Sequence, residues 1–238
     1  MGAKIKTAVK NLITRGFRFT ILRRFLWKHV AQRYELRFHV QDASRGESAS
    51  FRADIARFFE SFGFSPEQFR DKTIVDIGAR SHLVTSYFQG AEIIAIEPLA
   101  DKYLRAIPSC GLSKAAKIYS RPAESRIQEL KGRADFVISI NVLDHLVAFD
   151  DVIDNIHFYL KPGGTAFLSF DSHDYIDHMH PTILTEERCI NVFERAGFSV
   201  ARVSRGLGAA GCSTAFPRRS SYGHGEAINF WLVKPQAQ

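Results

Sequence analysis

Short apolar runs alternate with amphipathic stretches from about residue 73 to the end of the chain. The runs, which we expect to form strands, are 73–77, 92–96, 116–120, 135–140, 165–170, 199–205 and 227–233. Helices are expected between them at 83–89, 123–130, 150–160 and 186–196. Repeated strand–helix–strand units build parallel sheets, and apolar runs without polar alternation suit strands covered on both faces. The pattern predicts an α/β domain over 71–238 with helices on both faces of its sheet.

Before residue 71 the pattern is helical. Residues 1–37 place apolar side chains at helical spacing between Lys and Arg, and residues 41–50 are polar, as in a linker or turn. A helix is expected over 51–62. Ser65, Pro66 and Gln68 resemble the capping residues of another helix start. We therefore expect a basic amphipathic helical extension over 1–70.

The charge of the chain is concentrated in its first 37 residues. The 238 residues carry a net charge of +7, but residues 1–37 hold ten Lys or Arg and one acid, so the remainder is close to neutral at −2. This argues against a broadly basic nucleic-acid-binding face on the domain. Three roles stay open for the arm: a substrate lid, a peripheral contact with an anionic membrane, and, with least support, a nucleic-acid contact.

The remaining composition indicates a protein of the cytoplasm. The three cysteines, Cys110, Cys189 and Cys212, are far apart and match no zinc-site spacing, so we expect reduced thiols. No apolar run is long enough to span a membrane. We expect a cytoplasmic protein, with peripheral association at the inner membrane face if the arm binds lipid.

Two strand ends carry the residue types of a nucleotide site. The first expected strand ends in Asp76, Ile77 and Gly78, and Gly allows a sharp turn that brings the backbone close to a ligand. The second ends in Glu97, 21 residues after Asp76, where an acid can accept hydrogen bonds from a ribose diol. The strand–Gly turn alone is common architecture, and the spacing to Glu97 makes it more specific.

Later strand ends add further polar residues. Ala123 and Glu124 follow the third expected strand, and an acid there can receive an adenine amino group or simply favour a helix start. The fourth strand ends in a polar cluster that begins at Asn141 and includes Asp144 and His145. Residues 160–164 (Leu-Lys-Pro-Gly-Gly) end a helix and form a turn.

Taken together, these motifs resemble class I S-adenosylmethionine-dependent methyltransferases, in particular a bacterial subgroup acting on glycans and small molecules. The resemblance spans about 70–235. It implies a Rossmann-like, seven-stranded, mostly parallel sheet with the last strand antiparallel, and S-adenosyl-L-methionine as cofactor. By the same resemblance, the cofactor-binding residues are Asp76, Gly78, Ala79, Arg80, Glu97, Pro98, Leu99, Ala123, Glu124 and Asn141. The sequence departs from the family where Arg80 and His82 stand in place of further glycines. Arg80 can reach the cofactor carboxylate. A non-catalytic scaffold with an altered cofactor loop and a nucleic-acid methyltransferase that uses the basic arm are the two alternatives.

The expected reaction is methyl transfer to an oxygen, in preference to a nitrogen, of a small-molecule or glycan acceptor. His145 is the candidate general base and Asp144 the residue that orients it, although a capping or core role for His145 stays open. Residues 171–180 hold three His and three Asp. We expect His173, His178 and His180 to contact the acceptor. Metal binding and a solvated loop are the alternatives, and we assign no metal because the spacing matches no known template.

Overall fold

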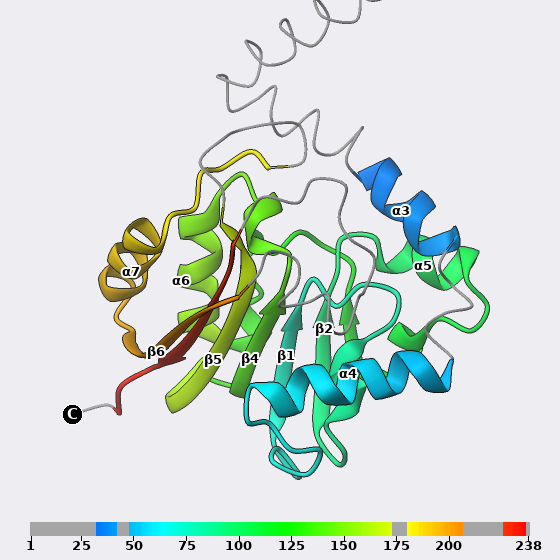
Figure 1. Cartoon of the computed structure of the whole chain (residues 1–238), viewed down its shortest axis with the longest axis horizontal. Helices are drawn as coiled ribbons and strands as arrows, with labels where there is room; N and C mark the ends of the chain where they lie inside the picture. The colour runs from blue at the N-terminus through cyan, green and yellow to red at the C-terminus, as the bar shows by residue number, and fades with distance from the viewer. Residues whose placement is uncertain (1–31, 42–47, 173–179, 207–225, 237–238) are drawn as a thin grey trace, which may run out of the picture.

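The structure is a computed structural model of the chain, and it describes residues 32–41, 48–172, 180–206 and 226–236. A seven-stranded sheet forms its centre (Figure 1). In spatial order the strands are β3 (Lys117–Tyr119), β2 (Glu92–Ile96), β1 (Thr73–Ile77), β4 (Ala134–Ile140), β5 (Leu160–Ser172), β7 (Glu226–Val233) and β6 (Ser199–Gly206). Strands β1 to β5 pair in parallel, and β7 pairs antiparallel with both β5 and β6. The predicted Rossmann-like sheet with an antiparallel last strand is confirmed.

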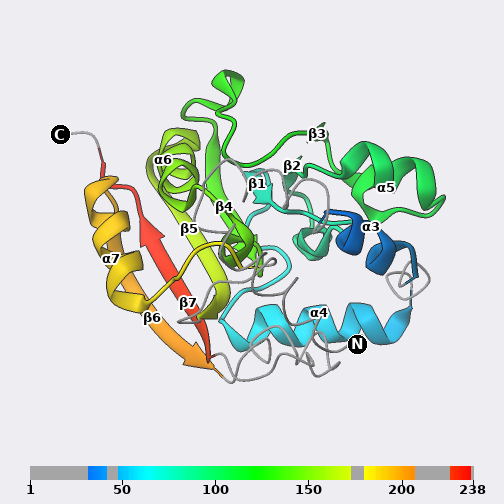
Figure 2. The same cartoon turned by 90° about the horizontal axis from the view of Figure 1, so that it is seen from above.

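Helices cover both faces of this sheet. The helices of the described residues are α3 (Gln32–Gln41), which lies against α5, and α4 (Ala49–Ser61), α5 (Ala100–Ala106), α6 (Phe149–Tyr159) and α7 (Glu186–Arg195). Seen from above, α4 lies on one side of the sheet and α6 on the other (Figure 2). The chain reverses its direction of travel across the sheet between β1 and β4, so the carboxyl ends of these strands form the edge at which ligands bind in such folds.

Helix α4 is joined to the sheet by an aromatic cluster. Phe51, Ile55, Phe58 and Phe59 recur at helical spacing and are buried against apolar side chains of β1, β4 and β5. Ser48 caps the helix by accepting a hydrogen bond from the Phe51 N–H at 3.1 Å. The helix predicted at 51–62 is thus present and belongs to the main core.

Two predicted helices are replaced by short 3-10 turns, so these predictions are wrong. In place of 83–89 the chain forms η3 (Val84–Tyr87), because Leu83 has a left-handed φ of 46° and the Gln89 N–H donates to the Pro66 carbonyl at 2.7 Å. The loop after Gly78 therefore leads into no regular α-helix.

In place of the predicted helix at 123–130 only η5 (Gln128–Leu130) forms. The Ile127 N–H, which would donate to the Ala123 carbonyl in a helix, donates to the Tyr159 hydroxyl at 3.0 Å. The Ala123 carbonyl accepts from the Asn155 amide at 2.9 Å instead. Side chains of α6 thus take over the hydrogen bonds that a helix would need.

Two smaller differences concern helix starts. The residues after Ser65 form turns, although the Ser65 N–H donates to the Gln68 side chain at 3.2 Å, which is half of the predicted capping box. Helix α5 was not predicted, because its seven residues lie directly after the Glu97 motif.

Among the described residues, no helix combines the length and apolar character needed to cross a bilayer.

Candidate functional site

The carboxyl ends of β1, β2 and β4 lie beside one another, and the residues that follow them line a cavity of about 70 Å³. Helices α3 and α5 close it. Its lining residues are Gln32, Glu35, Gly78, Arg80, Glu97, Pro98, Leu99, Tyr103, Asn141, Val142 and His145. Six of the ten residues predicted to bind a cofactor are in this set, so the fold brings the motifs of three separate strands to one place.

Gly78 forms the tight turn after β1. Its φ of 74° is left-handed, and its N–H donates to the Ile96 carbonyl at 2.8 Å. A Cβ at this position would lie 2.2 Å from a methyl carbon of Val142. Only glycine therefore fits between the first loop and the residues that follow β4.

Glu97 is a buried carboxylate at the end of β2. Its Oε1 accepts from the Leu99 N–H at 2.9 Å and its Oε2 from the Arg80 N–H at 3.0 Å. Burial raises the pKa of Glu97 to about 7, against the lowering effect of these two hydrogen bonds. The two backbone N–H groups fix the carboxylate toward the cavity, where each oxygen can accept a further hydrogen bond.

Arg80 and Asn141 face each other across the cavity. The Arg80 guanidinium donates to the Asn141 carbonyl, and both residues have left-handed backbones, with φ of 55° and 52°. Such conformations are costly for side-chain-bearing residues and concentrate at ligand sites. The predicted partner of Arg80 was a cofactor carboxylate; in this structure its side chain lines the cavity and is bonded to the residue that follows β4.

Asp76 and Ala79 lie behind the cavity and do not line it. The Asp76 carboxylate accepts from the Thr85 hydroxyl at 2.5 Å, and burial raises its pKa to about 6. Ala79 is packed in the apolar cluster under α5. Both residues support the loop from within the core.

Ala123 and Glu124 follow β3 and also lie outside the cavity lining. Their carbonyls accept from the Asn155 side chain at 2.9 and 3.2 Å, which ties this segment to α6. Their predicted contact with an adenine edge stays a prediction.

A cluster of acidic and imidazole groups lies next to the cavity. Asp144 and His145 belong to η6 (Leu143–His145), after β4, and His180 returns from the segment after β5. The Asp144 Oδ2 lies 3.6 Å from the His145 Nε2 and 3.8 Å from the His180 Nε2. The two imidazole rings stack with centroids 4.9 Å apart.

Asp171, at the end of β5, belongs to the same cluster. Burial and the nearby Asp144 carboxylate raise its pKa to about 6. Asp171 belongs to the His- and Asp-containing segment 171–180 that the sequence pattern indicated, but that pattern assigned it no role of its own. Of the three predicted acceptor contacts, His180 lies beside His145, whereas His173 and His178 lie outside the described residues.

Comparison of the sequence with protein families identifies this architecture. The sequence matches the family described as "Methyltransferase domain" over residues 48–203, which is more than half of the chain. The chain belongs to this methyltransferase domain family. A search of curated proteins found no match.

Solved structures share the fold of this methyltransferase domain at low sequence identity. The cyclase SpnF aligns with a TM-score of 0.61 and 16% identity over 87% of this chain and 96% of its own. The 1,6-didemethyltoxoflavin-N1-methyltransferase of Burkholderia thailandensis, solved with S-adenosylhomocysteine, aligns with a TM-score of 0.51 and 16% identity over 84% and 87%. A 16S rRNA (adenine(1408)-N(1))-methyltransferase of Catenulisporales acidiphilia aligns with a TM-score of 0.52 and 16% identity over 79% and 92%. Because these proteins have different substrates and one is named a cyclase, the likeness establishes the fold alone.

Helix α3 covers the cavity of the methyltransferase domain through a buried histidine. The His39 Nδ1 lies 2.8 Å from the Ser81 hydroxyl, and its ring contacts Tyr103 edge-on, with centroids 5.0 Å apart. Burial lowers the pKa of His39 to about 2. His39 was not among the predicted site residues, because a lone histidine on an amphipathic helix carries no sequence signal of burial.

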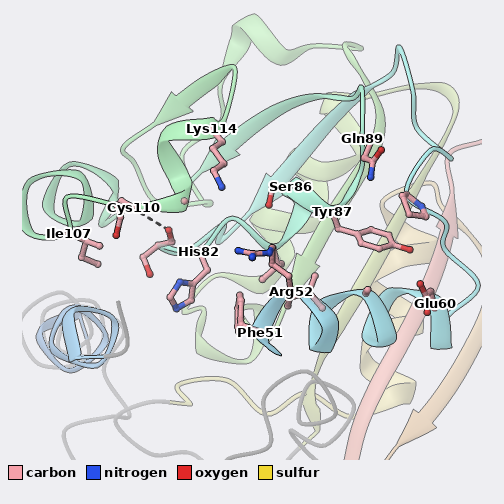
Figure 3. A pocket seen from close by; sticks show the side chains of 17 residues that line it. Phe51, Arg52, Glu60, His82, Ser86, Tyr87, Gln89, Ile107, Cys110 and Lys114 are labelled. Carbon is pink, nitrogen blue, oxygen red and sulfur yellow. Dashed lines mark hydrogen bonds between the residues drawn. The ribbon is translucent and has the colours of Figure 1, made fainter. Parts of the chain in front are cut away.

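A second, larger cavity of about 350 Å³ lies between α4 and the connection from β1 to β2 (Figure 3). Arg52, His82, Tyr87 and Lys114 are among its lining residues, and the nearby Cys110 thiol donates to the Ser81 carbonyl at 3.3 Å. Residues of η3, among them Ser86 and Tyr87, line this cavity. Sequence patterns contained no sign of it.

Proposed function

We propose that the chain binds S-adenosylmethionine in the 70 Å³ cavity and transfers its methyl group to an oxygen, in preference to a nitrogen, of a small molecule or glycan. The observation that carries the proposal is the buried Glu97 carboxylate at the end of β2, beside the Gly78 turn. A carboxylate in this position can accept hydrogen bonds from both hydroxyls of a ribose. Membership of the methyltransferase domain family supports the same assignment.

The residues present suit an adenosyl ligand. Glu97 would hold the ribose, Pro98 and Leu99 would pack against the adenine, and Gly78 and Asn141 would lie along the methionine portion. Sites for ligands of this size usually measure roughly 300–1,000 Å³. The cavity is several-fold smaller, so we propose that α3 and the Arg80 side chain move when the cofactor enters.

S-Adenosylmethionine supplies a methyl group already activated on a sulfonium, so positioning of the acceptor provides much of the acceleration. His145 lines the cavity, and we propose that its imidazole accepts the proton of the acceptor. Asp144 acts as the positioning residue for that imidazole. His180 contributes an acceptor contact, as do His173 and His178 in the predicted acceptor loop.

The part of the basic arm that the structure describes supports the lid role. Gln32 and Glu35 of α3 line the cavity, and His39 anchors the helix. The membrane and nucleic-acid alternatives concern the basic residues of 1–37, and all of these except Arg33 and Arg37 lie outside the described residues. We propose that α3 is the lid over the cofactor.

A second candidate function is a scaffold that does not bind the cofactor. The bond from the Arg80 guanidinium to the Asn141 carbonyl favours it, because this side chain spans the space that the methionine portion would need. Direct measurement of cofactor binding separates the two candidates.

The proposed function is tested by calorimetric titration of the full-length chain with S-adenosylmethionine and S-adenosylhomocysteine. Glu97→Ala removes the two charge-assisted hydrogen bonds that the carboxylate is proposed to accept from the ribose hydroxyls. Each is worth about 1.5–3 kcal/mol, and each 1.4 kcal/mol changes Kd about tenfold. We expect Glu97→Ala to weaken binding by at least about tenfold.

Glu92→Ala is the matched control, since Glu92 lies at the opposite end of the same strand and is exposed. Its affinity should stay within about twofold of the wild type, because surface ion pairs contribute little. Absence of binding to the wild type would remove the proposal and leave the scaffold alternative. Equal affinity of the Glu97→Ala variant would remove the assigned site.

A further inference from the structure

We propose that Asp144, His145 and His180 bind a divalent transition-metal ion next to the cofactor cavity. The three side chains come from two segments that are separated in the sequence, η6 after β4 and the segment after β5. One potential ligand atom from each lies within 4.8 Å of the other two. Two imidazoles and one carboxylate form a donor set that transition metals accept in proteins.

The buried carboxylate of Asp144 is the feature that points to a ligand. Its side chain is 1% exposed, and neither carboxylate oxygen has a hydrogen-bond partner among the residues that the structure describes. A buried carboxylate without a partner is costly, and a bound ion is one of the few ways to stabilise it. The nearest imidazole nitrogens, at 3.6 and 3.8 Å, are too far away for hydrogen bonds.

The same distances suit shared coordination of one ion. Two donor atoms bound to a metal at about 2.0–2.2 Å in tetrahedral geometry lie roughly 3.4 Å apart. The separations of 3.6 and 3.8 Å exceed this value by a few tenths of an ångström, so small side-chain movements would close the site. The imidazole donors favour zinc, copper, iron or nickel over magnesium and calcium, which prefer oxygen ligands.

The surroundings provide charge and access. Asp171 interacts electrostatically with all three residues and adds a second carboxylate beside the imidazoles. The side chains of His145 and His180 keep exposed fractions of 20% and 13%, so an ion could enter from solvent. With three protein ligands, a tetrahedral ion would keep one position open for another molecule.

The open position gives the ion a place in the reaction, and this step rests on the proposed function. His145 lines the cofactor cavity, so an acceptor hydroxyl bound to the ion would lie beside the methyl group. Coordination lowers the pKa of a bound hydroxyl, and its O–H bond breaks with release of the proton to water. The O–C bond then forms as the S–C bond breaks, leaving a neutral thioether. In this arrangement His145 is a ligand, and the ion replaces the imidazole as the group that activates the acceptor.

Zinc titration of the full-length, EDTA-treated and desalted protein tests the site. We expect one Zn²⁺ to bind per chain by calorimetry and the thermal unfolding midpoint to rise with Zn²⁺. Asp144→Asn and His180→Ala should each weaken zinc binding by at least about tenfold and abolish the rise. His157→Ala, on α6 and outside both cavities, is the control and should bind zinc as the wild type does.

Asp144→Asn also shows whether the fold survives. It replaces the buried charge by an amide of the same shape, so the metal-free variant should unfold at the same temperature as the wild type or higher. If this variant does not fold, His180→Ala carries the test alone. No zinc binding to the wild type, or equal binding to the wild type and a folded variant, would overturn the metal site.

A parallel titration with S-adenosylmethionine in EDTA separates the two proposals. Cofactor binding without zinc binding overturns the metal site alone. Zinc binding without cofactor binding supports the metal site and removes the proposed function.

Discussion

At Gly78 the backbone conformation and the facing chain both exclude a side chain. The left-handed φ of 74° disfavours any other residue, and Val142 fills the space where a Cβ would point. Glycine therefore determines how closely the first loop approaches the end of β4, and with it the shape of the cavity. Arg80 in the first loop and Asn141 after β4 also have left-handed backbones.

Gly78→Ala should lower both stability and cofactor affinity. Left-handed strain and overpacking against Val142 together cost about 2–5 kcal/mol. Denaturant unfolding measures the loss in the free energy of unfolding. Gly63→Ala is the matched control, because Gly63 has a φ of 85° but no atom within 4 Å of an added Cβ. Its loss should be only about 1–2 kcal/mol, and equal losses for both variants would contradict the predicted clash.

At the scale of elements, the docking of α3 on the domain depends on the neutral imidazole of His39. His39 docks against Ser81 and Tyr103, and burial is the main reason that its pKa falls to about 2, with Arg80 and His82 lowering it further. The nearest acid is Glu35, whose Oε2 lies 3.6 Å from the His39 Nε2. With a pKa this low the imidazole is neutral, so the contact with Glu35 contributes as a polar contact and not as an ion pair.

Docking of α3 should weaken in mild acid. The pKa of His39 in the folded chain lies below the unfolded value of about 6.5, so the undocked helix binds a proton more tightly. The stabilisation is therefore complete above about pH 6.5 and is lost as the pH falls below it. Between pH 7.5 and 5.5 the loss amounts to about 1.4 kcal/mol, which is a factor of about ten.

Hydrogen exchange of residues 32–41, corrected for the intrinsic rate, measures this effect. Protection should fall about tenfold in the wild type between pH 7.5 and 5.5. His39→Asn keeps a polar partner for Ser81 without titrating, and its protection should not change with pH. The same pH dependence in both proteins would exclude His39 as the cause.

At the scale of the whole molecule, the domain core includes α4. The sequence analysis placed a domain boundary between residues 70 and 71, and this boundary stays a prediction. Yet helix α4, which precedes this boundary in the sequence, buries four side chains against the sheet: Phe51, Ile55, Phe58 and Phe59. Burial of each such side chain contributes about 1.5–3 kcal/mol, which in sum is comparable to the net stability of a typical domain.

Truncated chains should therefore show whether the folded domain begins at residue 48 or at residue 71. A chain of residues 48–238 should unfold cooperatively, because it keeps α4 and its Ser48 cap. A chain of residues 71–238 should expose the aromatic face of β1, β4 and β5 and should aggregate or lack a cooperative transition. Circular dichroism during thermal unfolding distinguishes these outcomes, and a stable 71–238 chain would place the boundary where the sequence pattern suggested.

By itself, the sequence determined the sheet and the strand ends that carry the site. Apolar runs separated by helical stretches follow from local periodicity, so β1, β2 and β4 were predicted to within a residue, together with Gly78, Glu97 and Asn141 at their carboxyl ends. Only the tertiary structure decided where Arg80 points and that 83–89 and 123–130 are not helices. It also decided that His39 docks against Ser81 and that Asp144 and His180 lie beside His145. These features depend on hydrogen bonds and contacts between residues far apart in the chain, and such contacts leave no periodic pattern in the sequence.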